Sequence, residues 1–464
     1  MLSNSAKELW ELDRKHHLHP WTHFDSFREE GALLIDRGEG CYIYGAEKGE
    51  RYFDAVGGLW CTQIGLGRKE MADAIADQVM KLAYASPFTD MGNSPAAELA
   101  GKIAGLAPGN LNHVQFTLGG SEANDTAFRL IQYYWSCKGK PSKRHIISRI
   151  GSYHGTTHIC ASIAGKEMDR QPEFDYITEI VHHISYPNAY RAPDGMGEPE
   201  FLDFLVQELE DTILKVGPDN VAAFFAEPIM GAGGVIVPPE GYHKRTHEVC
   251  RKYDVLYVHD EVVTAFGRLG HWFASEDEFG IVPDIITCAK GITSGYLPLG
   301  ATIFSDEIHD AISEPGKDRL FTNGYTYSAH PVCCAAALKN LEIMEREEIL
   351  AHVMDVGAYF EERLHSLTDL PIVGQVRGSK MMMCVENVAD KETKELFPDE
   401  INIGKRIANA CDEMGLMVRP IVHLNVMSPP LVMTRDDVDF VVETLGKGIS
   451  KVTDDLVASG EWNG

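Results

Sequence analysis

The chain has 464 residues, of which 44% are hydrophobic and 24% are charged, and its 69 acidic and 42 basic residues give a net charge of -27. This composition is typical of a globular protein with room for one large α/β domain and a smaller companion. The negative charge would repel a phosphate backbone, and no stretch approaches the ~18 apolar residues that a membrane span needs. We therefore expect neither nucleic acid nor a membrane as a partner.

The first 70 residues are expected to form a helix over 10–17 and a hairpin over 41–55 that pack with the smaller domain. The chain starts with charges of both signs and lacks the basic start and apolar middle of a secretory signal. The ten cysteines are scattered without a C-x-x-C pair, which is typical of reduced thiols rather than of a zinc site. We therefore expect a cytoplasmic protein without a bound metal.

Residues 71–330 alternate between strand and helix patterns. Residues 113–118 place apolar side chains at every second position, and residues 119–135 change to helical spacing after a glycine pair. Further short apolar runs predict buried strands at 144–150, 221–228, 254–261, 284–290 and 300–306. Such strands, separated by helices, predict a large α/β domain with a mostly parallel sheet that is covered on both faces.

Residues 331–464 have a different pattern and are assigned to a smaller α/β domain. They begin with one or two long amphipathic helices and continue with predicted strands near 372–376, 380–385 and 417–420. The last predicted helix begins near Thr434, a candidate N-cap that is followed by acidic residues.

Polar residues follow or end several of the predicted strands. Ligands of open parallel sheets bind beyond the carboxyl ends of the strands, so these residues are candidates for chemistry. A glycine pair before Ser121 opens a helix whose free N–H groups suit a phosphate, Asp260 ends one apolar strand, and Lys290 ends another. Taken singly, each has a simpler explanation: a tight turn, a salt bridge or helix cap, and a lysine that extends to solvent.

Taken together, these residues supply what pyridoxal phosphate requires. The cofactor needs an amine for its aldehyde, a carboxylate to keep its pyridine nitrogen protonated, and donors for its phosphate. Lys290, Asp260 and the helix start at Ser121 meet these needs in turn, and we expect Gly291 to leave room for the cofactor. The sequence therefore predicts a pyridoxal phosphate site at the edge of the sheet.

Six motifs, in this order, resemble those of the class III aminotransferases, the omega-amino acid and amine:pyruvate branch of the fold-type I pyridoxal phosphate enzymes. They are FTLGGSEANDTAFR (116–129), GSYHGTT (151–157), FFAEPIMGAGGVIVPPEGY (224–242), HDEVVTAFGRLG (259–270), TCAKGITSGYLPLGA (287–301) and GYTYSAHPV (324–332). The resemblance covers essentially the whole chain. It implies the fold-type I transferase fold, with a large domain that binds the cofactor and a smaller α/β domain.

The resemblance implies a role for several residues around the cofactor. Lys290 matches the Schiff-base lysine, which also shuttles a proton during catalysis, and Asp260 matches the carboxylate paired with the pyridine nitrogen. Tyr153 matches the aromatic residue that stacks on one face of the cofactor ring, and Val262 matches the residue that packs on the other face.

Further matches concern the phosphate and the neighbouring subunit. Gly120 and Ser121 match phosphate contacts, and Glu227 matches an acidic residue that we expect to support the site. Thr326 matches the threonine that reaches the phosphate of the neighbouring subunit's cofactor. The resemblance therefore implies a homodimer or a higher homo-oligomer in which two chains build each site.

Three residues match substrate contacts of the family. Arg419 matches a mobile arginine that pairs with the carboxylate of the acceptor, a contact that suits a guanidinium group. Trp60 and Phe88 match aromatic walls of the substrate pocket. A surface arginine and aromatic residues of the core are the alternative explanations.

Five positions depart from the common pattern of the family. Gly119 stands where many relatives have serine, and Val263 stands where some have glutamine. Ala265 and Leu269 replace glycine and threonine, and Ala329 replaces glycine. None of these changes removes an essential group, but they bear on one phosphate contact, on the cofactor's phenolic oxygen and on the shape of the pocket.

The sequence thus predicts a pyridoxal phosphate-dependent transaminase that moves an amino group from an amine or omega-amino acid to a keto acid, with pyruvate as the expected acceptor, by a ping-pong mechanism. A beta-amino acid, taurine, a diamine such as putrescine, and an aryl amine remain open as donors. The alternatives are an aminomutase or decarboxylase of the same fold and a non-catalytic cofactor-binding regulator. The regulator is disfavoured by the net charge and by the lack of an added DNA-binding segment.

Overall fold

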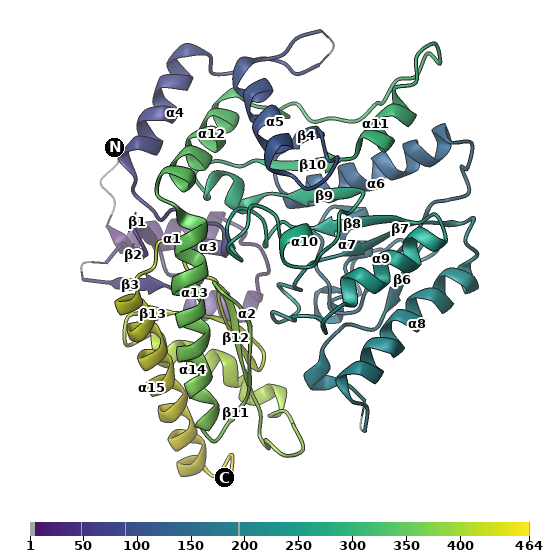
Figure 1. The fold of residues 1–464 in the computed structure, drawn as a ribbon. Coiled ribbons are helices and arrows are strands. Elements are labelled where there is room, and N and C mark those ends of the chain that lie inside the picture. The colour runs from purple at the N-terminus through teal and green to yellow at the C-terminus, as the bar shows by residue number, and fades with distance from the viewer. Residues whose placement is uncertain (1–4, 48, 89, 194, 464) are drawn as a thin grey trace.

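The computed structural model describes residues 5–47, 49–88, 90–193 and 195–463; the first four residues of the N-terminal segment and Lys48 of the predicted hairpin lie outside the described residues. A central sheet lies between layers of helices, and smaller sheets with the C-terminal helices lie beside it (Figure 1). None of the helices in the described part of the chain combines the length and the apolar character that a membrane span requires.

The central sheet has seven strands in the order β4-β10-β9-β8-β7-β5-β6; β10 is antiparallel to both β4 and β9, and the other neighbouring pairs are parallel. The strands are β4 (His113–Thr117), β5 (His145–Arg149), β6 (Val181–Ile184), β7 (Val221–Ala226), β8 (Leu256–Asp260), β9 (Ile285–Cys288) and β10 (Gly300–Phe304). The predicted mostly parallel sheet is confirmed. The sequence pattern missed β6, because two histidines interrupt its short apolar run.

Helices cover both faces of this sheet, as its buried strands require. On β7, Phe225 packs in a cluster with Ile131 of α6, whereas Phe224 packs in another cluster with Leu209 of α8. Successive side chains of a strand point to opposite faces, so one apolar strand serves both layers. The helices of this part are α6 (Gly120–Cys137), α7 (His158–Ile163), α8 (Glu198–Val216), α9 (Tyr242–Lys252), α10 (Ala274–Asp277) and α11 (Asp306–Ile312).

The C-terminal part contains a four-stranded sheet in the order β11-β12-β15-β14. The predicted long helical segment is two helices, separated at Glu348, whose φ is +51°. Thr434 caps the last helix through a capping box with Asp437, as the sequence predicts. The elements are α12 (Pro331–Arg346), α13 (Ile349–His365), β11 (Val373–Ser379), β12 (Met382–Asn387), α14 (Ile403–Asp412), β13 (Leu416–Met417), β14 (Arg419–Ile421), β15 (Leu424–Met427) and α15 (Arg435–Ser459).

The N-terminal part forms the predicted helix and hairpin and adds a third sheet, in the order β1-β2-β3-β13. β3 pairs in parallel with β13, with Phe53 beside Leu416, so the start of the chain lies against its C-terminal part. The elements are α1 (Ala6–His16), α2 (Phe24–Glu30), β1 (Ile35–Glu39), β2 (Tyr42–Gly45), β3 (Arg51–Asp54), α3 (Gly57–Trp60), α4 (Lys69–Lys81) and α5 (Ser94–Leu106).

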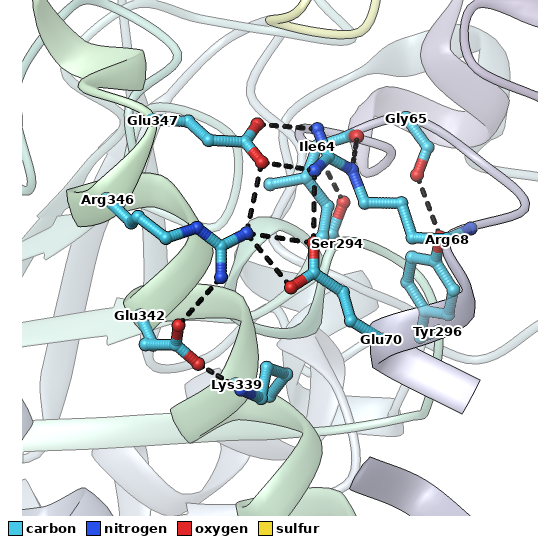
Figure 2. Close-up of polar contacts among 10 residues, drawn as sticks. All are labelled: Ile64, Gly65, Arg68, Glu70, Ser294, Tyr296, Lys339, Glu342, Arg346 and Glu347. Atoms are coloured by element: carbon cyan, nitrogen blue, oxygen red, sulfur yellow. Dashed lines mark hydrogen bonds and ion pairs between the residues drawn. The ribbon is translucent and has the colours of Figure 1, made fainter. Parts of the chain in front are cut away.

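Polar contacts tie the segment before α4 to the turn between β9 and β10 and to the end of α12 (Figure 2). The backbone N–H of Ile64 donates to Ser294 Oγ at 2.9 Å, and that of Arg68 donates to the Tyr296 hydroxyl at 2.9 Å. The guanidinium group of Arg68 makes two hydrogen bonds to Glu347, of 2.6 and 2.8 Å. These contacts hold the turn that carries the predicted cofactor lysine.

Candidate active site

A cavity of about 420 Å³ lies beyond the carboxyl ends of the central strands. The predicted site residues that line it are Trp60, Gly120, Ser121, Tyr153, Glu227, Asp260, Val262, Lys290 and Arg419. These residues come from segments that are far apart in the sequence, and most of them follow strands of the central sheet. The cavity therefore lies where ligands of open α/β sheets bind.

Lys290 reaches this cavity from a turn and not from a strand. β9 ends at Cys288, and Lys290 begins a 3₁₀ helix, so its prediction as the last strand residue is wrong. Its φ of +47° is left-handed, a conformation that costs a side-chain-bearing residue of order 1–3 kcal/mol. Burial lowers the pKa of Lys290, although Asp260 opposes this effect. More of the amine is therefore neutral, and hence nucleophilic, than in an exposed lysine.

Gly291 makes room for the side chain of Gln63 and not for a cofactor. A Cβ at this position would lie 2.0 Å from Gln63 Nε2 and 3.2 Å from Phe266 Cβ. The expectation for Gly291 is therefore corrected: the glycine allows the buried Gln63 side chain to approach the turn.

Asp260 ends β8, as predicted, and its buried carboxylate is surrounded by hydrogen-bond donors. Oδ2 accepts a hydrogen bond from Asn124 Nδ2 at 2.8 Å and lies 2.8 Å from His154 Nδ1, while Oδ1 accepts from the backbone N–H of Val262 at 3.1 Å. Asn124 is oriented in turn by Thr287, whose hydroxyl donates to its Oδ1 at 2.8 Å. A buried carboxylate needs such partners, and these hold it in one orientation.

Two glycines shape the start of α6, which faces the cavity. Gly119 is the N-cap of this helix, and no side chain of the described residues caps it, so its first N–H groups suit an anion. A Cβ on Gly120 would lie 2.9 Å from Val262, and a Cβ on Gly155 would lie 2.5 Å from Ser121 Oγ. The glycines therefore let the backbone approach the helix start closely, as a phosphate cradle requires.

Glu227 holds the backbone next to the cavity. Its carboxylate accepts hydrogen bonds from the backbone N–H of Tyr153 at 3.1 Å and of Gly231 at 2.7 Å. Burial raises the pKa of Glu227, while the nearby His154 and Arg149 oppose this rise. Glu227 thus orients the segment that carries the Tyr153 ring.

The opposite end of the cavity contains side chains from loops. Trp21 Nε1 donates to Asp169 Oδ1 at 3.3 Å, and Lys166 Nζ donates to the same oxygen at 3.2 Å. The rings of Trp21 and Tyr153 are 5.9 Å apart between centroids. Arg419 begins β14 at this end, and burial lowers its pKa while Tyr153 and Asp169 oppose that shift.

Sequence reasoning missed several of these residues. His154 and Asn124 lie inside the quoted motifs, and the need of a buried carboxylate for donors could have found them. Trp21 and Asp169 carry no such signal, because they lie outside the motifs on irregular segments that only the fold brings to the cavity.

Phe88 and Thr326 lie outside the cavity of this chain. The Thr326 carbonyl accepts a hydrogen bond from the Tyr84 hydroxyl at 2.9 Å, and the Phe88 ring lies 3.5 Å from the place of a Cβ on Gly324. The two predicted residues thus lie on neighbouring exposed segments. Phe88 is not a wall of the cavity that its own chain forms.

The residues around the cavity fit pyridoxal phosphate. The partly buried amine of Lys290 suits an aldehyde, and the glycine-lined start of α6 suits a phosphate. Asp260 supplies a fixed carboxylate for a protonated pyridine nitrogen, and Tyr153 and Val262 line the same space.

Comparison with known proteins agrees with this geometry. Residues 26–449 match the model of the family described as aminotransferase class-III. A putrescine–pyruvate aminotransferase from Pseudomonas aeruginosa is 40% identical over 460 residues, which cover 98% of this chain and 99% of the relative. The crystal structure of an (S)-enantioselective omega-transaminase from Thermomicrobium roseum matches with a TM-score of 0.94 and 42% identity, over 97% of this chain and 99% of that one.

A structure of the omega-transaminase from Pseudomonas jessenii in complex with PMP matches with a TM-score of 0.93 and 36% identity, over 96% of this chain and 98% of that one. The resemblance seen in the six motifs is thereby confirmed. The chain belongs to the class III aminotransferases and is a pyridoxal phosphate-dependent transaminase of fold-type I.

Proposed function

We propose that this transaminase transfers an amino group from an amine or omega-amino acid to pyruvate in two half-reactions. The observation that carries the proposal is the presence of Lys290, Asp260 and Arg419 around one cavity. The putrescine–pyruvate aminotransferase of P. aeruginosa, which matches along nearly its whole length, supports pyruvate as the acceptor and an amine without a carboxylate beside it as the donor.

Lys290 acts as the base and as the point of cofactor attachment. Pyridoxal phosphate, when bound, supplies the electron sink that makes a proton on the amine-bearing carbon acidic. Lys290 Nζ takes that proton from the donor and, in the second half-reaction, returns a proton to the corresponding carbon of the keto acid. The lowered pKa of Lys290 suits both attachment to the cofactor and proton abstraction, because each of these steps starts from the neutral amine.

Asp260 and Arg419 fix the two ends of the reacting complex. The three donors around Asp260 compensate its buried charge, so this carboxylate is oriented before any ligand arrives. Arg419 lines the same cavity and offers a guanidinium group for the carboxylate of pyruvate. The two half-reactions thus share Lys290 and Asp260 and differ in the group that the substrate presents to the end of the cavity at Arg419.

A homodimer completes this site in our proposal, with Thr326 contributed to the phosphate of the partner subunit's cofactor. Thr326 and Phe88 lie beside exposed apolar side chains, and large exposed apolar patches are typical of protein interfaces. The exposed apolar residues of these two segments are Val79, Met80, Leu82, Tyr84, Phe88, Met91, Leu320 and Tyr327.

We also place the protein in the cytoplasm. All ten cysteines are free, and eight of them are buried among other side chains. Reduced cysteines in such numbers favour a reducing compartment.

A panel of donors with pyruvate, read by the formation of alanine, tests the proposed reaction. We expect alanine with at least one donor whose amine lies on a terminal or non-alpha carbon. An aminomutase or a decarboxylase of the same fold would consume its substrate without transferring nitrogen to pyruvate. Turnover of the donors without any alanine would therefore contradict the proposed reaction.

A further inference from the structure

The cavity contains three carboxylates, and only one of them has an oxygen without a partner in the described chain. Glu227 receives the backbone N–H groups of two residues, and Asp260 is held by three donors. Asp169 differs: both of its hydrogen-bond donors, Trp21 and Lys166, reach Oδ1, and no described residue donates to Oδ2. Its side chain is 16% exposed, and Oδ2 is not sealed from solvent, so this oxygen is open to a ligand that enters the cavity.

The surroundings of Asp169 suit a cation. Trp21 donates its indole N–H to the carboxylate, and its ring lies 5.9 Å from the ring of Tyr153, so aromatic side chains as well as a negative charge border this end of the cavity. The present partner, Lys166, is three residues away in the sequence, and its side chain is as little exposed as that of Asp169. Lys166 donates only to Oδ1, so a ligand cation can bind at Oδ2 and share the carboxylate with Lys166.

Asp169 and Arg419 act on the same end of the cavity. Burial raises the pKa of Tyr153 and the charge of Asp169 adds to that rise, whereas the same charge opposes the lowering of the Arg419 pKa by burial, so the carboxylate acts on the residue proposed to bind pyruvate. The far end of the cavity can therefore recognise opposite charges in the two half-reactions. A keto acid presents a carboxylate to Arg419, whereas a donor with a second ammonium group would present a cation to Asp169.

We propose that the donor is a diamine, and that Asp169 binds its distal ammonium group while the other amine reacts at Lys290. This inference rests on the proposed transamination to pyruvate and specifies its donor. Asp169 contacts the unreactive end of the donor, so it determines specificity without taking part in proton transfer. No bond is made or broken at Asp169.

The test compares 1,4-diaminobutane with 1-aminobutane, each with pyruvate, in the wild-type holoenzyme and in Asp169→Asn. Asparagine keeps the shape of the side chain and removes its charge. We expect kcat/KM for the diamine to fall roughly 10- to 100-fold, the range for a lost hydrogen bond to a charged group, and kcat/KM for the monoamine to change less than about twofold. The loss for the diamine should lie in KM, because the contact is the same in the ground and transition states.

Two further variants make the result specific. Glu167→Gln removes an exposed carboxylate of the same short helix that does not line the cavity, and it should leave both donors unchanged. Lys166→Gln removes the cation that competes for Asp169, and it should raise kcat/KM for the diamine.

The outcomes separate this inference from the reaction on which it rests. An equal loss for the diamine and the monoamine in Asp169→Asn would show a structural role only, and no loss for either would show no role; both results would overturn the proposal. A wild-type enzyme that forms alanine from the monoamine but not from the diamine would also overturn it. Absence of alanine from every amine would instead refute the proposed reaction.

Discussion

The two ends of the active-site cavity are built in different ways. The floor consists of buried residues on or just after strands and at the start of α6, joined by hydrogen bonds of 2.7–3.1 Å: Asn124, His154, Glu227 and Asp260. The mouth consists of partly or largely exposed residues from loops and a strand start: Trp21, Lys166, Asp169 and Arg419. The rigid sheet therefore holds the groups needed for every turnover, whereas the groups that meet the variable part of the substrate lie on segments that can change without disturbing the fold.

Replacing Lys290 with alanine should have the largest effect, because it removes both the attachment point and the base. We expect turnover to fall by roughly 10⁴-fold, the upper range for a general acid–base residue. Steady-state alanine formation measures this, and borohydride reduction followed by peptide mapping should place the cofactor on residue 290 in the wild type alone. Lys166→Ala is the matched control at the mouth. A comparable loss in that control would remove the distinction between floor and mouth.

Arg419→Ala should change substrate preference and not the chemical step. Loss of a charge-assisted contact of about 1.5–3 kcal/mol corresponds to a rise in KM for pyruvate of roughly 10- to 100-fold. KM for an amine without a carboxylate should stay within about twofold, as measured by varying each substrate at saturation of the other. Equal rises in the two KM values would show that Arg419 supports the pocket generally and does not read the acceptor.

His154→Ala, a change in the floor, should lower the free energy of unfolding more than a change at the mouth does. The change removes a donor from the buried carboxylate of Asp260, and an uncompensated buried group costs about 1–3 kcal/mol. Urea unfolding of the apoenzyme should show this loss, whereas Asp169→Asn at the mouth should stay within about 0.5 kcal/mol of the wild type. A destabilisation of similar size in both variants would mean that the mouth is as tightly integrated as the floor.

The sequence predicts Asp260 of the floor from a local signal but misses its partners Asn124 and His154. An apolar run that ends in Asp260 and a glycine pair before Ser121 can be read directly from neighbouring residues. Lys290 lines the cavity from a turn and not from the strand that the apolar pattern predicts, because a φ of +47° leaves no trace in such a pattern. The strand ends at Cys288, two residues before its predicted end at Lys290.

The residues of the mouth, and Phe88 and Thr326 outside the cavity, could not be predicted from local patterns. Trp21 is more than 100 residues from Tyr153, and only the completed fold brings their rings together. Asp169 lies in a short 3₁₀ helix without a periodic pattern. Phe88 and Thr326 lie outside the cavity of their own chain, so their predicted roles depend on a second chain and not on local sequence.

The smallest expected effect concerns Ala329, one of the departures from the family pattern, which lies outside both floor and mouth. Its φ is +53°, a left-handed conformation that costs a residue with a Cβ about 1–2 kcal/mol. Ala329→Gly should therefore raise the free energy of unfolding by up to about 1 kcal/mol, because the greater entropy of unfolded glycine offsets part of the gain. Alanine formation should not change, since Ala329 does not line the cavity.

Ala265→Gly is the matched control, because Ala265 also stands where the family commonly has glycine but is not left-handed and is buried. There the glycine relieves no strain and only gains freedom in the unfolded chain, so it should lower stability by about 0.5–1 kcal/mol. Opposite signs in urea unfolding would show that backbone conformation, and not resemblance to the family, decides the effect of each glycine. If both variants gained stability, relief of left-handed strain could not be the cause. If Ala329→Gly also changed turnover, the conformation of this segment would matter for the site to which Thr326 is proposed to contribute in the partner subunit.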